Sequence, residues 1–319
     1  MSEGVRPTIV VVGIGGAGCN TIQRLHEVGT GYARTIAIHT EANHLANIKA
    51  WTKLLVGESI CKGFGTGGNP IVGERAVQED LDKIINAIGR PNVLIVTGGL
   101  GGGTASGGIT PILEEMASRS PDTIRLALVT FPFSWEGTGK INNARYALTR
   151  ILKAADLTII NLNDLLLKRI GTIQVDYAFK YMDALLVNTI KSLTNIFTLP
   201  HNVSISFADF VAIARDAGLG AVGHGVGGRV GDATKTALRN TLLDAEIKDA
   251  DSALAYLQVG KGASLEEAGE ATRILTEEYG LERVYWGLRM DPSCDRPRVM
   301  VMVSGVRSPT LEGLIGGSF

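Results

Sequence analysis

Five short apolar runs recur along the first half of the chain, each rich in β-branched residues and followed by a polar or glycine-rich segment. They are residues 8–12, 35–38, 93–96, 126–130 and 157–160. Runs that are almost continuously apolar predict strands buried on both faces. Helix-like spacing between them predicts helices at residues 21–28, 73–88 and 110–117. This alternation of strand and helix predicts an α/β fold with a doubly wound parallel sheet.

The second half begins with a longer periodic segment. Residues 175–197 contain no Gly or Pro and carry apolar residues at helical spacing, which predicts a long amphipathic helix ending before Pro200. Beyond it the pattern predicts a smaller α+β domain, with helices at 207–217 and 233–243 and strands at 254–259, 284–290 and 299–304. We therefore expect a first domain at 1–172, a central helix at 173–200, a second domain at 201–307 and a frayed tail at 308–319.

Composition and charge narrow the classes of protein. Of 319 residues 45% are hydrophobic and 20% are charged, and 31 Lys and Arg balance 32 Asp and Glu. This balance argues against a dedicated nucleic-acid binder. The three cysteines are too scattered for a disulfide framework or a paired-cysteine zinc site, which favours a cytoplasmic protein. Apolar runs stay short of the roughly 20 residues that a bilayer needs, so we expect no direct membrane insertion.

Glycine is concentrated in loops that follow predicted strands. Residues 13–18 read GIGGAG and residues 98–108 read GGLGGGTASGG, each before a predicted helix. The first is a G-x-G-x-x-G phosphate cradle, a weak signal alone because glycines also serve tight turns. It leaves open a dinucleotide-binding oxidoreductase that uses Glu41. The second loop is not needed by such a fold, so two cradles favour a polyphosphate held by backbone amides, Thr104 and Ser106.

Several ordered motifs resemble one family. GLGGGTASG at 99–107 resembles the tubulin/FtsZ signature loop, and VVGIGGAGCN at 11–20 resembles the opening of FtsZ. The resemblance continues through GGNPIVG at 67–73, PFSWEG at 132–137, NDLL at 163–166, AFKYMD at 178–183, FAD at 207–209 and TLLDAEI at 241–247. It covers nearly the whole chain, which is identified as an FtsZ-like member of the tubulin superfamily of archaeal type.

The resemblance implies a GTP-binding, self-assembling cytoskeletal GTPase that forms head-to-tail filaments in cell division or cell-shape control. Its cofactors would be GTP or GDP with Mg²⁺ and no metal site built from protein ligands, and its partner a second copy or another FtsZ-like protein. The residues that would contact phosphates are Gly15, Gly16, Ala17, Gly101, Gly102, Gly103, Thr104, Ala105, Ser106 and Lys140. Those that would contact base or ribose are Asn20, Glu136, Asn163, Phe179 and Asp183.

These assignments have plainer alternatives. Phe179 on an apolar helix face is often a core residue, Asp183 a solvated charge, and Glu136 with Lys140 an exposed ion pair of little energy. If the assignments hold, the Asp183 carboxylate faces the donors of guanine, which adenine lacks. Substitution of Gly102 or Gly103 by valine is then expected to block nucleotide binding and to leave the fold intact.

The loop that begins the second domain departs from the family pattern. The family's N-x-D-F-A-D segment supplies acidic residues to the next subunit's nucleotide, whereas this chain reads Ser204, Ile205, Ser206, Phe207, Ala208, Asp209. Serine supplies no charge to polarise water, so hydrolysis is expected to be slow. Lys140 stands where the family commonly has Arg, and Ala105 replaces a signature glycine. A slow or non-hydrolysing GTP-binding scaffold that co-assembles with another FtsZ-like protein is the second hypothesis.

Overall fold

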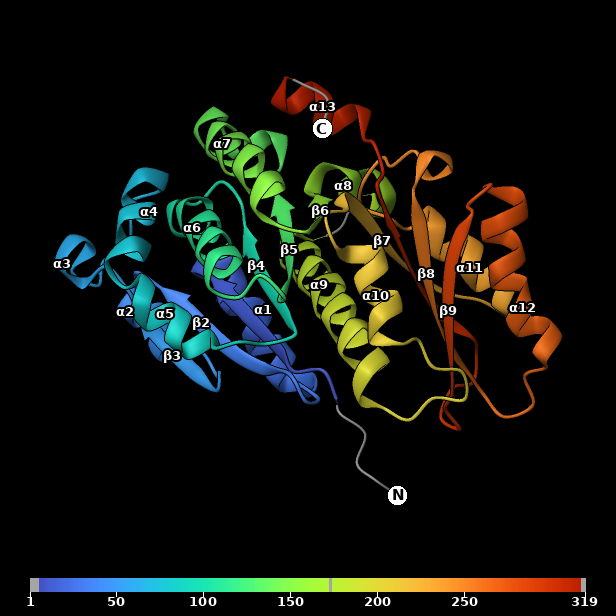
Figure 1. Ribbon diagram of the computed structural model, residues 1–319. Coiled ribbons are helices and arrows are strands. Elements are labelled where there is room, and N and C mark those ends of the chain that lie inside the picture. The colour runs from blue at the N-terminus through green and yellow to red at the C-terminus, as the bar shows by residue number, and fades with distance from the viewer. Residues whose placement is uncertain (1–5, 172–173, 317–319) are drawn as a thin grey trace. The chain divides into compact units, whose positions relative to one another are not determined.

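The computed structural model describes residues 6–171 and 174–316, apart from the side chains of residues 170, 175, 176, 178 and 179 (Figure 1). Contacts divide the chain into two compact units, Met1–Lys191 and Ser192–Phe319. The division falls inside the long helix α9 (Val175–Thr198), whereas the sequence pattern favoured borders near the two ends of that helix.

Six parallel strands form the sheet of the first unit. They are β1 (Ile9–Ile14), β2 (Arg34–His39), β3 (Thr52–Leu55), β4 (Val93–Gly99), β5 (Ile124–Phe131) and β6 (Leu157–Leu162). Their order is β3-β2-β1-β4-β5-β6. The strand order reverses between β1 and β4, which is where doubly wound sheets bind ligands. The predicted parallel sheet is confirmed, and β3 is a strand that the apolar pattern missed.

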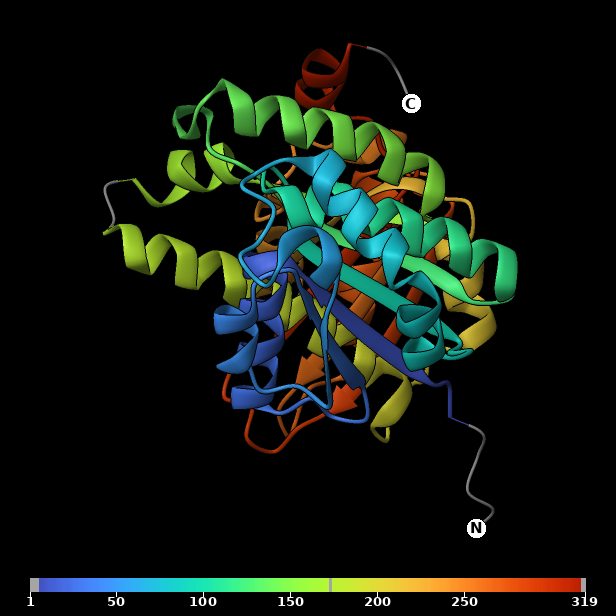
Figure 2. The same ribbon diagram turned by 90° about the vertical axis from the view of Figure 1, so that its left-hand side faces the viewer.

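Helices cover both faces of this sheet (Figure 2). They are α1 (Gly15–Val28), α2 (Ala42–Ala46), α3 (Glu58–Cys61), α4 (Pro70–Glu79), α5 (Leu81–Ile88), α6 (Gly103–Arg119), η1 (Ser134–Glu136), α7 (Thr138–Ala154) and α8 (Asn163–Ile170). α1 packs on one face, and α5, α6 and α7 lie on the other, as right-handed crossovers require. Among the described residues, no helix combines the length and the apolar content needed to cross a membrane.

Three helices of the first unit differ from the pattern-based prediction. The single helix expected at 73–88 is two helices that meet at Asp80, whose carboxylate accepts a hydrogen bond from Gly57 N at 2.8 Å. The helices expected from residues 21 and 110 begin earlier, at Gly15 and Gly103. α1 and α6 therefore each start within a glycine loop, and their first backbone N–H groups belong to that loop.

The second unit has a mixed sheet. Its strands are β7 (Gly218–Val226), β8 (Ser252–Val259), β9 (Arg283–Met290) and β10 (Arg298–Ser304). β10 runs antiparallel between β7 and β8, and β9 is parallel to β8. Its further elements are α10 (Phe207–Ala214), α11 (Val230–Arg239), η2 (Ile247–Asp249), α12 (Leu265–Arg273), η3 (Ile274–Glu278) and α13 (Pro309–Ile315). The predicted smaller α+β part is confirmed.

The segment expected to fray is partly a docked helix. Ser308 caps α13 by accepting a hydrogen bond from Leu311 N, and Leu311 itself is fully buried. The Asp244 carboxylate accepts hydrogen bonds from the Ser308 hydroxyl and from Thr310 N. The sequence showed little periodicity here because a seven-residue helix has room for few apolar positions.

Candidate functional site

The two glycine loops meet at the carboxyl edge of the first unit's sheet, because β1 and β4 are neighbours and each runs into a helix. A Cβ on Gly15 would lie 3.3 Å from Ala105 N, and one on Gly18 would lie 2.5 Å from Thr97 O. A side chain at Gly18 would clash with β4, and one at Gly15 would crowd the start of α6. Gly15 also has a φ of 71°, which favours glycine.

A cavity of about 470 Å³ opens beside the loops, within the usual range for small-molecule sites. Eleven of the residues assigned from the sequence line it: Gly15, Gly16, Ala17, Gly102, Gly103, Thr104, Ala105, Glu136, Lys140, Asn163 and Asp183. They come from elements between β1 and α9 of the first unit. The fold therefore brings most of the predicted nucleotide residues to one place.

Four of the assigned residues are placed differently. Asn20 is exposed on α1 and is not among the lining residues. Ser106 is 1% exposed, and its hydroxyl accepts a hydrogen bond from Gly101 N at 2.9 Å. Ser106 and Gly101 thus shape the signature loop from behind, and neither lines the cavity. Phe179 lies on α9, but its side chain is outside the described part of the chain.

Two buried polar atoms of the lining residues have no hydrogen-bond partner in the described structure. They are Asn163 Oδ1 and His44 Nε2. Buried polar atoms are nearly always paired, by protein, water or a ligand. A polar ligand in the cavity would supply the missing partners, so the site fits a nucleotide better than a set of empty turns.

Two histidines beside the first loop were missed by the sequence analysis. A Cβ on Gly16 would lie 3.9 Å from His39 Nε2 and 3.9 Å from His44 Cε1. His39 Nδ1 accepts a hydrogen bond from Glu41 N at 2.8 Å, so the neutral ring carries its proton on Nε2. Burial lowers the pKa of His39 to about 4, which keeps the ring neutral near pH 7. The available signal was that His39 ends β2 and His44 follows it, at the carboxyl end of the strand, which shares the ligand edge of the sheet.

Three charged residues that line the cavity, Glu136, Lys140 and Asp183, have ion-pair partners. Lys140 Nζ lies 2.9 Å from Glu136 Oε2, with the lysine about half exposed, so the ion pair considered from the sequence is present. Asp183 is not simply solvated, because Arg24 Nε lies 2.9 Å from its carboxylate. Burial raises the pKa of Asp183, and the Arg24 guanidinium opposes that rise. Asp183 thus presents a partly desolvated carboxylate to the cavity.

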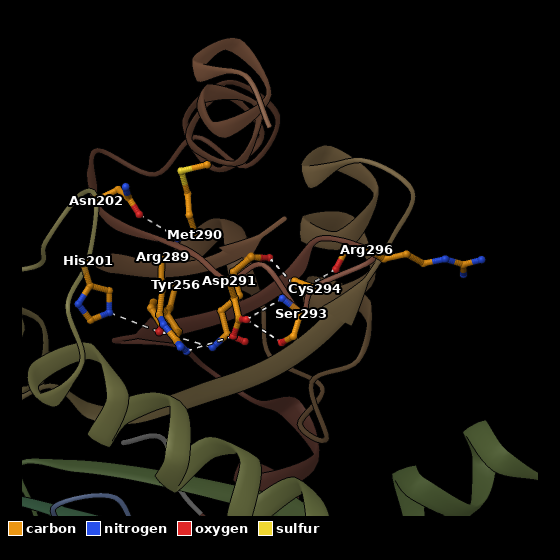
Figure 3. A network of polar contacts seen from close by, with 10 residues as sticks. His201, Asn202, Tyr256, Arg289, Met290, Asp291, Ser293, Cys294 and Arg296 are labelled. Carbon is orange, nitrogen blue, oxygen red and sulfur yellow. Dashed lines mark hydrogen bonds and ion pairs between the residues drawn. The ribbon is translucent and has the colours of Figure 1, made fainter. Parts of the chain in front are cut away.

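The loop assigned to hydrolysis lies in the second unit and is fastened to its strands. Asn202 Oδ1 accepts a hydrogen bond from Met290 N at 2.9 Å, and His201 Nε2 lies 3.3 Å from the Tyr256 hydroxyl (Figure 3). Tyr256 is 2% exposed on β8. Burial lowers the pKa of His201 and raises that of Tyr256, so both are neutral near pH 7.

Within this loop, the predicted catalytic residues have a structural role as well. Ile205 is 6% exposed, whereas Ser204 and Ser206 are exposed. Ser206 Oγ accepts a hydrogen bond from Asp209 N at 3.1 Å, and Asp209 Oδ2 accepts one from Ser206 N at 3.0 Å. This capping box begins α10. The Ser-x-x-Asp signature of such a box, followed by an apolar run, is visible in the sequence.

Two family models match the chain. The model of the Tubulin/FtsZ family, GTPase domain, covers residues 8–171, and that of the FtsZ family, C-terminal domain, covers residues 217–307. The chain belongs to the tubulin/FtsZ family. Its first unit is therefore a GTPase domain of this family, and the two glycine loops lie within the matched range.

Relatives within the family agree with this assignment. Cell division protein FtsZ 1 of Pyrococcus horikoshii is 38% identical over 311 residues, which are 96% of this chain and 83% of the relative. Cell division protein FtsZ of Haloferax mediterranei is 36% identical over 317 residues, which are 98% and 84% of the two chains. The expected resemblance to archaeal FtsZ is confirmed.

Solved structures agree on the fold. An empty FtsZ dimer from M. jannaschii has a TM-score of 0.88 and 33% identity, and the match covers 95% of this chain and 89% of that one. CetZ2 from Haloferax volcanii, a GTPγS-bound protofilament, has a TM-score of 0.83 over 97% and 96% of the chains. At 22% identity the latter shows the fold alone.

Proposed function

We propose that this chain is a cytoplasmic, GTP-binding cytoskeletal GTPase that assembles head to tail into filaments for cell division or cell-shape control. The observation that carries the proposal is the cavity where two glycine loops meet, in a chain of a GTPase family. Helix N-termini at α1 and α6 offer backbone N–H groups to phosphates. The named relatives support a role in division.

The direct test is the identity of the nucleotide that the purified protein releases on denaturation, measured by chromatography. We expect GTP or GDP. Release of NAD would revive the oxidoreductase that uses Glu41, an alternative that leaves the second glycine loop without a purpose. A protein that releases nothing and fails to bind added GTP in titration would contradict the proposal.

Guanine selection is assigned to Asp183, because a desolvated carboxylate at the cavity matches the paired donors of guanine. Asp183→Asn should remove most of the preference for GTP over ATP, measured by equilibrium titration of both. Arg24→Gln is the matched control, since it breaks the same ion pair but keeps the carboxylate. If both variants lose the preference equally, the pair is structural and Asp183 does not select the base.

Mg²⁺ fits this site as a partner of the phosphates. The described residues hold no group of three or more His, Cys, Asp or Glu side chains arranged for a metal. Mg²⁺ commonly uses one or two carboxylates with phosphates and water, so such a group is not required. Glu136 and Asp183 already have cationic partners, which leaves Glu41 as the cavity carboxylate to hold the ion. The ion would neutralise phosphate charge.

A slow or non-hydrolysing scaffold that co-assembles with another FtsZ-like protein is the second candidate. It is favoured by the capping box, in which the Ser206 and Asp209 side chains bond to each other's backbone N–H. Asp209 is the one carboxylate in residues 204–209, and it also serves as part of the helix cap. Slow turnover with filaments that persist in GTP would support this candidate.

A further inference from the structure

A third glycine-rich loop, residues 64–69 between α3 and α4, also borders the cavity. Gly67 and Gly68, at its tip, line the cavity and have φ angles of 60° and 78°. A Cβ on either would meet nothing within 4 Å. Backbone hydrogen bonds hold the ends of the loop: Gly65 N donates to Thr40 O and Asn69 N donates to Thr66 O, each at 3.1 Å. The position of the tip therefore depends on what else reaches it.

Asn143 of α7 reaches the tip. Its Nδ2 lies 2.8 Å from Gly68 O and 3.1 Å from Gly101 O. A side-chain amide nitrogen carries two N–H groups, so one Asn143 amide can serve both carbonyls at once. Both neighbours are acceptors, which fixes the nitrogen rather than the oxygen at this position. Gly101 belongs to the signature loop, so one side chain joins two loops that border the cavity.

The helix that carries Asn143 is itself anchored. Arg150 makes two hydrogen bonds to the Glu74 carboxylate, at 2.7 and 2.8 Å, and Tyr146 OH adds a third at 3.1 Å. Glu74 lies on α4, which follows the glycine loop directly. Residues 143, 146 and 150 share one face of α7 by helical spacing. Asn143 therefore projects from a fixed support toward both loops.

We propose that Asn143 is a positioning residue for the phosphate end of the site. It sets the spacing between loop 64–69 and the signature loop without lining the cavity itself. The inference rests on the proposed function, because it concerns the phosphates of a bound nucleotide. Without the two hydrogen bonds from Asn143, the distance between Gly68 and the signature loop at Gly101 and Gly102 is no longer fixed. The two loops then cannot both contact a phosphate that lies between them.

The test compares Asn143→Leu with the matched control Asn142→Leu. Leucine has nearly the shape of asparagine but donates no hydrogen bond, and Asn142 is an exposed neighbour with no hydrogen bond to either loop among the described residues. Two measurements are made: the dissociation constant for GTP, and deuterium uptake of segments 64–69 and 99–103 in nucleotide-free protein. We expect N143L to weaken GTP binding about tenfold and to raise uptake in both segments. N142L should leave both unchanged.

The outcomes separate this inference from the proposed function. Unchanged GTP affinity in N143L, or increased uptake in one loop only, would overturn the positioning role. If N143L unfolds, Asn143→Asp is the second variant, because it keeps the shape and polarity but turns an acceptor toward both carbonyls. It should also weaken GTP binding and raise deuterium uptake in both segments. If the wild-type protein binds no GTP, the proposed function fails, while the uptake comparison still decides whether Asn143 couples the loops.

Discussion

His39 is 7% exposed, and burial lowers the pKa of its imidazole to about 4. In the unfolded chain the pKa is 6.5, so as pH falls the unfolded state takes up the proton first. The free energy of unfolding should therefore fall by about 3 kcal/mol between neutral pH and about pH 4 through this residue alone. His39→Asn, whose amide oxygen can still accept from Glu41 N, should flatten that part of the profile.

The measurement is denaturant unfolding of the nucleotide-free protein across this pH range. The difference between wild type and variant isolates His39 from other groups that titrate there. Equal slopes for the two proteins would mean that His39 titrates normally in the folded state. The prediction concerns stability, so it stands apart from any effect of the ring on nucleotide binding.

Neighbouring glycines of the signature loop have different tasks. A Cβ on Gly102 would meet nothing within 4 Å, whereas one on Gly103 would lie 2.2 Å from Thr66 Oγ1 and 2.6 Å from Asn69 O. Gly102→Val should therefore abolish nucleotide binding with little change in stability, because its side chain enters the cavity. Gly103→Val should lower stability by about 1–3 kcal/mol, as overpacking does.

Nucleotide titration and thermal unfolding of the two variants distinguish these effects. For Gly103 the contact with loop 66–69 argues against the expectation that valine leaves the fold intact, and the sequence does not show this contact. Nor does either glycine supply a positive φ, which occurs at Gly15 and Gly101. Normal GTP binding by Gly102→Val would show that phosphates lie elsewhere.

Between elements, the ion pair of Glu74 and Arg150 joins α4 to α7. The Arg150 hydrogen bonds are the main reason that the pKa of Glu74 lies below its ordinary value of 4.5. The pair therefore stabilises the fold above that ordinary pKa, and this stabilisation is lost as pH falls through the lowered one. Glu74→Gln should lower the free energy of unfolding by about 1–2 kcal/mol near pH 7 and by much less in acid.

Asp82→Asn provides the comparison for this ion pair. Asp82 also pairs with an arginine, Arg119, but its side chain is 79% exposed. Exposed pairs contribute little, so we expect almost no effect on unfolding by denaturant. If Glu74→Gln and Asp82→Asn lower the free energy of unfolding equally, the bidentate contact between Arg150 and Glu74 adds no stability beyond that of an exposed ion pair.

At the scale of the whole molecule, hydrolysis should depend on assembly. Asp209 lies in the second unit, whereas every residue lining the cavity lies in the first. If Asp209 acts on a neighbour's nucleotide, GTP turnover per subunit should rise with protein concentration. Asp209→Ala should lower phosphate release at least tenfold while GTP affinity stays the same. Ser206→Asp should raise the rate, because aspartate also caps helices and adds a carboxylate.

The rate of phosphate release is measured for the wild type, Asp209→Ala and Ser206→Asp over a range of protein concentrations. Asp209→Ala also removes half of the capping box, so its folding is checked by thermal unfolding. Ser206→Asp keeps the cap and is the cleaner variant. Turnover that is independent of concentration and unaffected by Asp209→Ala would place the catalytic group elsewhere.

Much of the first unit follows from local pattern. β1 and β4 are apolar and β-branched, so they read as buried strands, and each glycine loop after them marks the start of a helix. The rule that ligands lie where strand order reverses then predicts that the two loops meet. β7 escaped detection because it is rich in glycine. Cβ atoms at Gly223 and Gly225 would lie about 2 Å from carbonyl oxygens of α11, so the strand carries glycine where a helix packs on it.

What the sequence by itself determined was the alternation of most strands and helices, the family and eleven of the residues that line the cavity, because periodicity and contiguous motifs are local properties. The tertiary structure decided the rest. His39 is neutral because of its burial, Gly103 has no room for a side chain because loop 66–69 packs on it, and Asn143 joins residues 68 and 101. Each depends on atoms far apart in the chain, and distances between such atoms exist only after the sheet has formed.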